Sequence, residues 1–278
     1  MELEKERWSE GLKRIKPEVK NIFYKGDIGL LVDSAPKLAI VGSRRMTEYG
    51  QRIIEKWMPT LVQHGITIVS GFMYGVDQTA HKACLDNGGK TIAVLGWGID
   101  WLVYSQDEEL YQKIVEVDSL ILSEYPEKIA PQLWMFPARN RIVAGMSDAV
   151  LVIEGSTKSG SMITARLATR FGKKLLALPG QVTSRVAEGT NGLIRDGKAK
   201  LVSTADDVLK EMGLIAGQMK FEMENIDDPM LSLLSDGERS VDEMARLLKM
   251  NVSQVLGKLT ELTLCGLVIE SGGKYRMV

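Results

Sequence analysis

The sequence of 278 residues is poor in cysteine, in histidine and in long apolar runs. Its two cysteines, Cys84 and Cys265, lie far apart in apolar helical patterns, which predicts buried thiols and no disulfide framework. Two histidines, His64 and His81, are too few for a histidine-rich metal site. No run approaches the ~18 apolar residues of a membrane span, and the charged N-terminus does not resemble a secretion signal. These absences predict a cytoplasmic protein without metal, cofactor or membrane contact.

An excess of basic charge is also missing, because 35 Lys and Arg face 36 Asp and Glu, a net charge of −1. This balance argues against nucleic-acid binding through bulk basicity. The charge is nevertheless uneven along the chain. Residues 136–200 hold eleven basic and four acidic residues, whereas residues 100–127 hold eight acidic residues and one lysine. A near-neutral protein with one basic segment can still present a phosphate-binding face.

The apolar pattern predicts an α/β core over residues 37–212, built as a doubly wound parallel sheet with helices on both faces. Residues 1–36 form an N-terminal extension ahead of it. Short apolar, β-branched runs predict buried strands at 38–41, 67–70, 91–95, 120–123, 150–153 and 175–178. Helical patterns between them cover 49–63, 76–87, 108–115, 140–146 and 161–171.

A second, smaller domain is expected at residues 229–278, after a linker at 213–228. Three helical patterns followed by two strands around Ser271-Gly272-Gly273 predict a winged helix-turn-helix. Its third helix carries little basic charge, which favours a protein-interaction or packing role over DNA reading.

Four loops at the carboxyl ends of the predicted strands carry residues suited to bind an anion: three combine glycine with hydroxyl groups, and the third has two arginines. The first, residues 42–47, leads into a helix and is either an anion site or a capped helix start with solvent-facing arginines. The second, residues 70–77, precedes His81, which lies one helical turn after Asp77. A structural hydrogen bond between these two is favoured over a catalytic pair.

The third loop contains Arg139 and Arg141, which either grip phosphate or pair with Glu124 or Glu154. The fourth, residues 159–164, again opens a helix with glycine and hydroxyls, and a further turn, residues 179–181, ends the last core strand. Both G-x-G-x-x-G and the P-loop pattern are missing from these loops, so neither a dinucleotide nor ATP hydrolysis is expected. Four phosphate-type loops at one edge predict an anion there, bound even without a larger ligand.

The order of these motifs resembles the DprA/Smf DNA-processing proteins over about residues 22–212. The segments that carry the resemblance are IVGSRRMTEYG, SGFMYGVDQTAHKACLDNGGKTIAVLGWGID, LSEYP, FPARNRIVAGMSDAVLVIEGSTKSGSMITARLA and ALPG. The resemblance implies an extended Rossmann-like core that binds single-stranded DNA without sequence preference, dimerises and helps to load RecA during natural transformation. It implies no catalysis.

Site residues follow from the loops and from the resemblance together. Arg44 is the principal candidate, with Lys173 and Lys174 extending the basic path and Phe72, Tyr74 or Phe136 stacking on bases. The expected DNA or phosphate contacts are Gly42, Ser43, Arg44, Ser70, Gly71, Gly75, Arg139, Asn140, Arg141, Ser159, Gly160, Ser161, Thr164 and Lys173. Asp77, His81 and Glu124 are expected to support them.

The sequence departs from the family at Tyr74, where Arg or Lys is usual, and at residues 104–109, which are acidic and one residue shorter. Both departures remove cations from one rim. Two alternatives therefore stay open: a phosphoribohydrolase-like enzyme, whose glycine-rich loop and catalytic Glu are not matched at residues 155–164, and an interaction scaffold that has lost DNA binding. The apolar residues Leu193, Ile194, Leu201 and Val202 further predict a two-fold dimer through residues 175–212.

Overall fold

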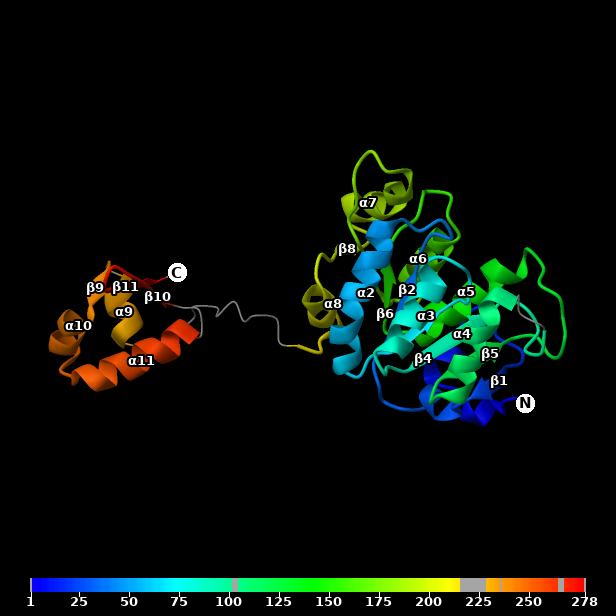
Figure 1. Ribbon diagram of the computed structural model, residues 1–278, viewed down its shortest axis with the longest axis horizontal. Coiled ribbons are helices and arrows are strands. Elements are labelled where there is room, and N and C mark those ends of the chain that lie inside the picture. Colours follow the sequence, from blue (N-terminus) through cyan, green and yellow to red (C-terminus); the bar gives the residue numbers. More distant parts are fainter. Residues whose placement is uncertain (1, 102–104, 216–228, 236, 265–267, 278) are drawn as a thin grey trace. The chain divides into compact units, whose positions relative to one another are not determined.

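The computed structural model describes residues 2–101, 105–215, 229–235, 237–264 and 268–277. The chain divides into two compact units, residues 1–216 and 217–278 (Figure 1). The expected linker lies mostly outside the described residues, and Leu214 and Ile215 pack on the core of the first unit. No described helix is long and apolar enough to cross a membrane.

The described residues of the first unit form an eight-stranded sheet of order β1-β5-β4-β3-β2-β6-β7-β8. Only β1 runs antiparallel to its neighbour, β5. The strands are β1 (Phe23–Gly26), β2 (Lys37–Val41), β3 (Thr67–Ser70), β4 (Thr91–Leu95), β5 (Leu120–Ser123), β6 (Ala149–Val152), β7 (Lys174–Ala177) and β8 (Lys200–Leu201). The six predicted strands are therefore present within one residue of the expected bounds. The edge strands β1 and β8 were missed because both are short and lack a buried apolar run.

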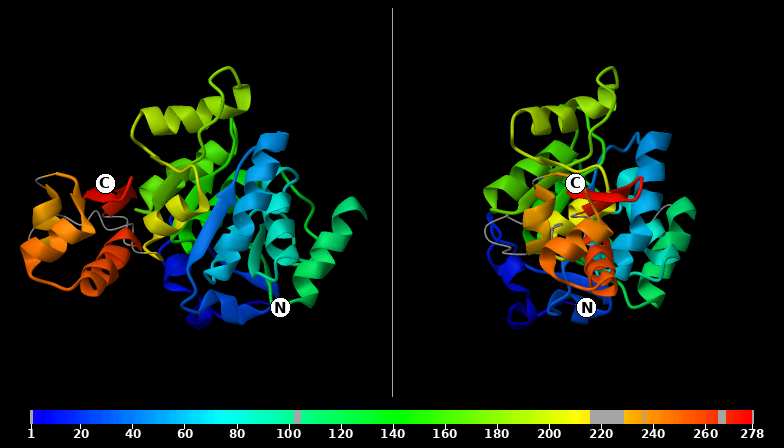
Figure 2. Two further views of the ribbon diagram at one scale, coloured as in Figure 1. Left: turned by 60° about the vertical axis from the view of Figure 1, so that its left-hand side comes forward. Right: turned by 90° about the vertical axis from the view of Figure 1, so that its left-hand side faces the viewer.

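Helices cover both faces of this sheet, as a doubly wound fold requires (Figures 1 and 2). One face packs against α1 (Glu10–Lys13), α5 (Met135–Met146), α6 (Ser161–Arg170) and the N-terminal segment. The other packs against α2 (Glu48–Gln63), α3 (Val76–Asp86), α4 (Ser105–Glu116) and α8 (Ala205–Met212). α7 (Glu188–Arg195) follows the short 3₁₀ helix η3 (Arg185–Ala187). The predicted Rossmann-like α/β class is thus confirmed.

The N-terminal segment belongs to the packed core of the first unit. Leu3, Trp8, Leu12 and Ile15 are buried in the same cluster as the sheet. Two 3₁₀ helices belong to this part of the chain, η1 (Lys5–Arg7) between Leu3 and Trp8 and η2 (Ile28–Leu31) after β1. The residues predicted as an extension therefore complete one layer of the fold.

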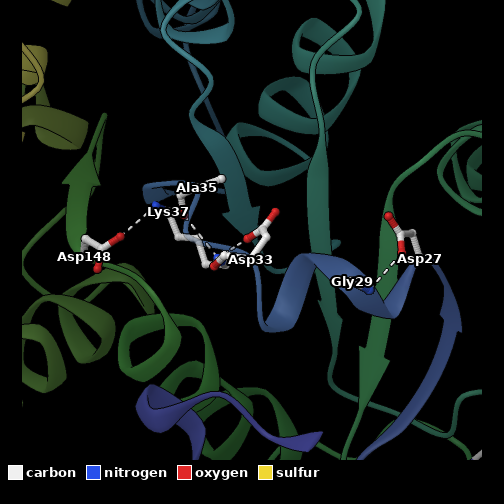
Figure 3. A network of polar contacts seen from close by, with 6 residues as sticks. All are labelled: Asp27, Gly29, Asp33, Ala35, Lys37 and Asp148. Atoms are coloured by element: carbon white, nitrogen blue, oxygen red, sulfur yellow. Dashed lines mark hydrogen bonds and ion pairs between the residues drawn. The ribbon is translucent and has the colours of Figure 1, made fainter.

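A network of polar contacts fixes the amino end of β2 (Figure 3). The Lys37 ammonium donates to a carboxylate oxygen of Asp33 at 2.7 Å and to the carbonyl of Ala35 at 3.1 Å. The backbone N–H of Lys37 donates to the Asp148 carboxylate at 2.8 Å. Lys37 is buried, so this pairing compensates its charge.

The second unit has helices α9 (Pro229–Ser235), α10 (Val241–Leu248) and α11 (Val252–Leu264). Its three-stranded antiparallel sheet has the order β10-β11-β9, with β9 (Arg239–Ser240), β10 (Val268–Ser271) and β11 (Lys274–Met277). This arrangement agrees with the predicted winged helix. Three large apolar side chains, Leu247, Val252 and Leu256, are exposed in α10 and α11.

The structure describes one of the two cysteines, Cys84. Cys84 is buried against α2 and the sheet, and burial raises the pKa of its thiol to about 12. Cys265 lies outside the described residues.

Candidate functional site

A pocket of about 630 Å³ lies at the carboxyl ends of β2, β3 and β6. The chain leaves β2 toward β3, β4 and β5 and later returns to the other side of β2 with β6. Parallel α/β sheets bind ligands at such a switch point, because the loops diverge there and leave a crevice. All four loops singled out in the sequence contribute to the lining, through Gly42–Arg45, Gly71, Arg139–Asn140 and Ser159–Thr164.

Arg44 is one of two exposed arginines of the first loop, beside Arg45. Its guanidinium carbon lies 5.8 Å from the ring centre of Tyr74 and 5.2 Å from that of Phe136. Aromatic faces attract a cation at these distances and restrict its motion. Gly42 lets the loop pass close to its neighbours, since a Cβ there would lie 2.5 Å from Val76 and 2.9 Å from the carbonyl oxygen of Glu154.

The N-terminus of α2 does not supply the expected anion site, because Glu154 already occupies it. The buried Glu154 carboxylate accepts from the backbone N–H of Thr47 at 2.8 Å and from its hydroxyl at 2.5 Å. An internal carboxylate thus takes the place of an external anion at this helix end. The alternative of a capped helix start with solvent-facing arginines describes this loop better.

The second loop packs closely against the first loop. Gly75 has φ +83°, and a Cβ there would lie 2.4 Å from the carbonyl oxygen of Ser43, so only glycine lets the two loops touch. Gly71 is equally confined, since its Cβ would lie 2.5 Å from both the Arg139 guanidinium and the Asp77 carboxylate. Phe72 is buried at φ +135°, a strained value for a residue with a side chain.

Asp77 and His81 do not form the expected pair. His81 Nδ1 lies 2.7 Å from Thr91 Oγ1, and that hydroxyl donates its own proton to the Ile68 carbonyl at 2.8 Å. Nδ1 therefore donates to Thr91. Nε2 of His81 is buried without a hydrogen-bond partner among the described residues. The prediction failed because the side chain of His81 turns into the sheet and not along its own helix.

Asp77 instead adjoins Arg139. Burial raises the pKa of the Asp77 carboxyl, although the charge of Arg139 and a backbone hydrogen bond from Met73 oppose that rise. Burial likewise lowers the pKa of Arg139 to about 10, against the attraction of Asp77. Both groups lie about the position that a Cβ of Gly71 would take, so their opposite charges are adjacent and compensate one another.

The two arginines of the third loop are directed into the protein, which corrects their proposed role as phosphate grips. α5 begins at Met135, five residues earlier than predicted, so both lie inside the helix. Arg139 is 3% exposed and donates to the carbonyl of Val94. Arg141 forms a two-pronged salt bridge with Glu124, with one Nη1–Oε2 distance of 2.8 Å, as its structural alternative required.

In the fourth loop, the hydroxyl groups of Ser159 and Ser161 form hydrogen bonds within the loop. Ser159 Oγ lies 2.8 Å from Ser161 Oγ and accepts from the Ser161 backbone N–H at 3.3 Å. Asn140 donates to the carbonyl of Gly160 at 3.3 Å and so ties α5 to this loop. Ser161 and Thr164 are buried, whereas Gly160 is exposed and open to solvent.

Several expected contacts lie away from the pocket. Ser70 is buried and donates to the carbonyl of Ile40 at 2.6 Å, which keeps it within the sheet. Lys173 directly precedes β7, at the amino end of the strands, and lines a different pocket. Lys174 donates to the Glu211 carbonyl. Neither lysine therefore extends the positive charge of the pocket at the carboxyl ends.

Two exposed residues of the pocket lining, Arg185 and Leu133, were not among the residues expected from the sequence. Arg185 is exposed and reaches the pocket from η3, and Leu133 is exposed ahead of α5. Arg185 follows the carboxyl end of β7, so the rule that selected the other loops would have found it.

The pocket carries net positive charge. Among its described lining residues, the charged ones are Arg44, Arg45, Arg139, Arg185 and Asp77. Since Arg139 and Asp77 compensate one another, the three exposed arginines set the charge that a ligand meets.

A family model described as DNA recombination-mediator protein A matches residues 1–213 of this chain. The chain belongs to the DprA/Smf family. DNA processing protein DprA of Streptococcus pneumoniae is 43% identical over 190 residues, which make up 68% of this chain and 66% of that protein. Protein Smf of Synechocystis is 43% identical over 180 residues, 65% of this chain and 45% of that protein. The chain thus spans between about half and two thirds of the length of these DprA/Smf relatives.

Two solved DprA structures share the fold. The X-ray structure of the pneumococcal DprA superposes with a TM-score of 0.70 at 38% identity, covering 76% of this chain and 74% of that one. DNA processing protein A from Helicobacter pylori, whose structure is described in terms of a unique single-stranded DNA binding mode, gives a TM-score of 0.68 at 31% identity. That match covers 76% of this chain and 94% of that one.

Of the two departures noted in the sequence, Tyr74 lines the pocket, whereas none of the described residues of segment 104–109 does. Tyr74 is exposed and contacts Arg44, so an aromatic ring stands where the family usually has a cation. In the acidic segment 104–109, residue 104 lies outside the described residues, and α4 begins at Ser105.

Proposed function

We propose that this DprA/Smf protein binds single-stranded DNA without sequence preference at the pocket between β2 and β6. The carrying observation is the exposed Arg44 guanidinium, held by the rings of Tyr74 and Phe136 at the pocket lining. An arginine can donate two parallel hydrogen bonds to one phosphate, and Arg45 and Arg185 extend the charge to neighbouring phosphates.

Exposed ring surface favours a single strand over a duplex. Tyr74 is 52% exposed and lines the same pocket as Arg44. Unpaired bases stack on such rings irrespective of sequence, whereas the bases of a duplex are already stacked on one another. The single-stranded DNA binding mode of the H. pylori protein supports the same choice.

The biological role that follows is a recombination mediator in DNA uptake, which loads RecA onto the bound strand. The family description as a recombination mediator supports this role. We propose binding without catalysis, because the one carboxylate among the described lining residues, Asp77, is taken up by Arg139. The protein would act in the cytoplasm, where RecA and incoming DNA meet.

The test is a fluorescence anisotropy titration with labelled oligo-dT at several salt concentrations, with duplex DNA for comparison. Arg44→Ala should weaken single-strand binding tenfold to hundredfold, since a charge-assisted contact of about 1.5–3 kcal/mol is lost. Arg7→Ala removes an exposed arginine that does not line this pocket, and should leave affinity unchanged. Equal affinities for all three proteins would refute the proposal.

The winged-helix unit is not expected to hold the single strand, because the exposed residues near the start of α11 include the apolar Val252 and Leu256. Deleting residues 229–278 should keep single-strand affinity within a few-fold. Loss of binding in this truncation, with normal binding by Arg44→Ala, would place the DNA site in the second unit.

We also propose that the protein is a two-fold dimer through residues 175–212. Leu201 is 46% exposed and supports this surface, whereas Val202 is buried and Leu193 and Ile194 pack on the core. Light scattering after size-exclusion chromatography at high micromolar concentration should give twice the monomer mass. A monomer mass there would refute the dimer.

A further inference from the structure

A cluster of four cations surrounds a second pocket, of about 520 Å³, at the amino ends of the strands. Arg14 and Lys16 follow α1, Arg170 ends α6, and Lys173 directly precedes β7. The DNA pocket lies at the carboxyl ends of the same sheet, so the two pockets belong to opposite edges.

Close packing of α1 on α5 builds this cluster. A Cβ on Gly11 would lie 2.7 Å from the carbonyl oxygen of Gly145, and a Cβ on Gly145 would lie 2.4 Å from the side chain of Ile15. The two glycines therefore let the helices approach closely. Arg141 Nε donates to the carbonyl of Pro17 at 3.0 Å and fixes the chain just after Lys16. Arg14 and Lys16 are thereby held beside the end of α6.

The charge of this cluster is poorly compensated inside the protein. Among the described residues, Lys16, Arg170 and Lys173 have no hydrogen bond or salt bridge from their charged groups. Glu10, the one acid lining the pocket, lies 3.2 Å from Lys13 and 3.7 Å from Arg14.

Two more carboxylates, Asp33 and Asp148, line an adjacent pocket together with Lys173, and both are engaged by Lys37 (Figure 3). Asp148 accepts from the backbone N–H of Lys37, and Asp33 pairs with the Lys37 ammonium. Burial lowers the pKa of Lys173 and the charge of Arg14 adds to this effect, whereas the charge of Asp148 raises that pKa. Four cations thus meet one partly satisfied acid in the pocket.

Helix dipoles explain only part of this arrangement. A cation at the C-terminus of a helix is favourable, which accounts for Arg14 and Arg170. Lys173 lies beyond the turn that ends α6 and is half-buried, so its position gains little from that dipole. A half-buried, uncompensated ammonium is costly unless an external anion pairs with it.

We propose that Arg14, Lys16, Arg170 and Lys173 form a second contact for the phosphate backbone of a nucleic acid, on the edge opposite the DNA pocket. This inference rests on the proposed function in one respect, that the ligand is the same single strand.

The chemistry of the pocket favours a backbone over a small phosphate ligand. Helix α6 ends here, and the N-terminus of the one-turn helix α1 is capped by the Ser9 hydroxyl, which accepts from the Leu12 N–H, so the cluster lacks the free N–H groups that hold a single phosphate or nucleotide. Phe171, its one lining aromatic residue, is partly buried against the core and offers no stacking face. Long cationic side chains without a base-reading group suit a polymer of phosphates.

The test compares four full-length proteins: the wild type, Arg44→Ala, the pair Arg170→Gln with Lys173→Gln, and the combination. Each is titrated with an oligo-dT of about 40 nucleotides over a range of salt. The glutamine pair should lower the slope of log K against log salt by about 1.4, because each lost phosphate contact contributes about 0.7. Its effect should add to that of Arg44→Ala, since the two sites share no partners.

Controls separate charge from folding. Arg7→Gln with Lys56→Gln removes two exposed cations elsewhere and should leave the slope unchanged. Lys173→Arg with Arg170 intact should retain wild-type binding, because the charge is kept. Tryptophan fluorescence should show that every variant is folded.

Each outcome decides a separate point. An unchanged slope in the glutamine pair, with weakened binding in Arg44→Ala, overturns this inference and leaves the proposed function standing. The reverse result keeps the cluster as a DNA contact and overturns the proposed pocket. If polyglutamate of equal charge binds the wild type more tightly than oligo-dT and loses that affinity in the glutamine pair, the partner is an acidic protein and the inference is wrong.

Discussion

The buried His81 should make the first unit sensitive to mild acid. Its Nδ1–H donates to Thr91, so a second proton must enter at Nε2, which has no described acceptor and lies in an apolar setting beside Phe72. Burial, and secondarily the charge of Arg139, lower the pKa of His81 from 6.5 to about 3. The folded state therefore keeps His81 neutral at a pH where the unfolded chain is protonated.

The sign and size of the effect follow from that shift. Between pH 6.5 and 3 the unfolded state binds more protons, so the free energy of unfolding falls as the pH is lowered through this window. At pH 5 the loss from this single group is about 2 kcal/mol relative to pH 8. With an m-value of about 2–3 kcal/mol/M, the urea midpoint should move by about 0.7–1 M.

The assay is urea unfolding of the wild type and His81→Asn at pH 5 and pH 8, followed by tryptophan fluorescence. All five tryptophans lie within residues 1–134, so the signal reports the first unit alone. Asparagine can still donate to Thr91 but cannot titrate. The difference between the two pH values should therefore shrink by about 2 kcal/mol in the variant.

His64→Asn is the matched control, because His64 is the second histidine of the chain and lies exposed at the end of α2. It should retain the full pH dependence of the wild type. If His81→Asn shows the same acid sensitivity as the wild type, neutral burial of His81 is not its cause.

Three further predictions concern stability and reactivity. In urea unfolding, Gly75→Ala should lower the free energy of unfolding by more than Gly65→Ala does. Both glycines have positive φ, but only Gly75 lies against another loop. Equal losses would show that this contact is unimportant. In the same assay, Glu154→Ala should lower the free energy of unfolding by about 1–3 kcal/mol, because the Thr47 N–H loses its acceptor. An unchanged free energy of unfolding would contradict the role of Glu154 as a cap of α2. The Cys84 thiol, with its pKa raised to about 12, should resist iodoacetamide at pH 8 until the protein unfolds, as peptide mapping would show, and rapid alkylation of the folded protein would refute its burial.

The sequence by itself determined the six inner strands of the sheet, the presence of the helices between them and the edge at which the loops meet. The runs 38–41 and 150–153 are apolar and β-branched, so they form buried parallel strands, and the carboxyl ends of parallel strands share one edge. This is local information, readable from periodicity alone. The position of Lys173 could also be predicted from the sequence. It precedes a predicted strand, so it belongs to the opposite edge of the sheet.

Only the tertiary structure decided which charged groups face the pocket. The sequence predicts both Arg44 and Arg139 in loops that bind phosphate, yet Arg44 is exposed and Arg139 is buried in α5 against β4. Glu154 takes the N-terminus of α2 from 107 residues away. The physical reason is that a charge is buried or exposed according to the partners that long-range packing brings to it, whereas hydrophobic periodicity records only which face of each element is apolar.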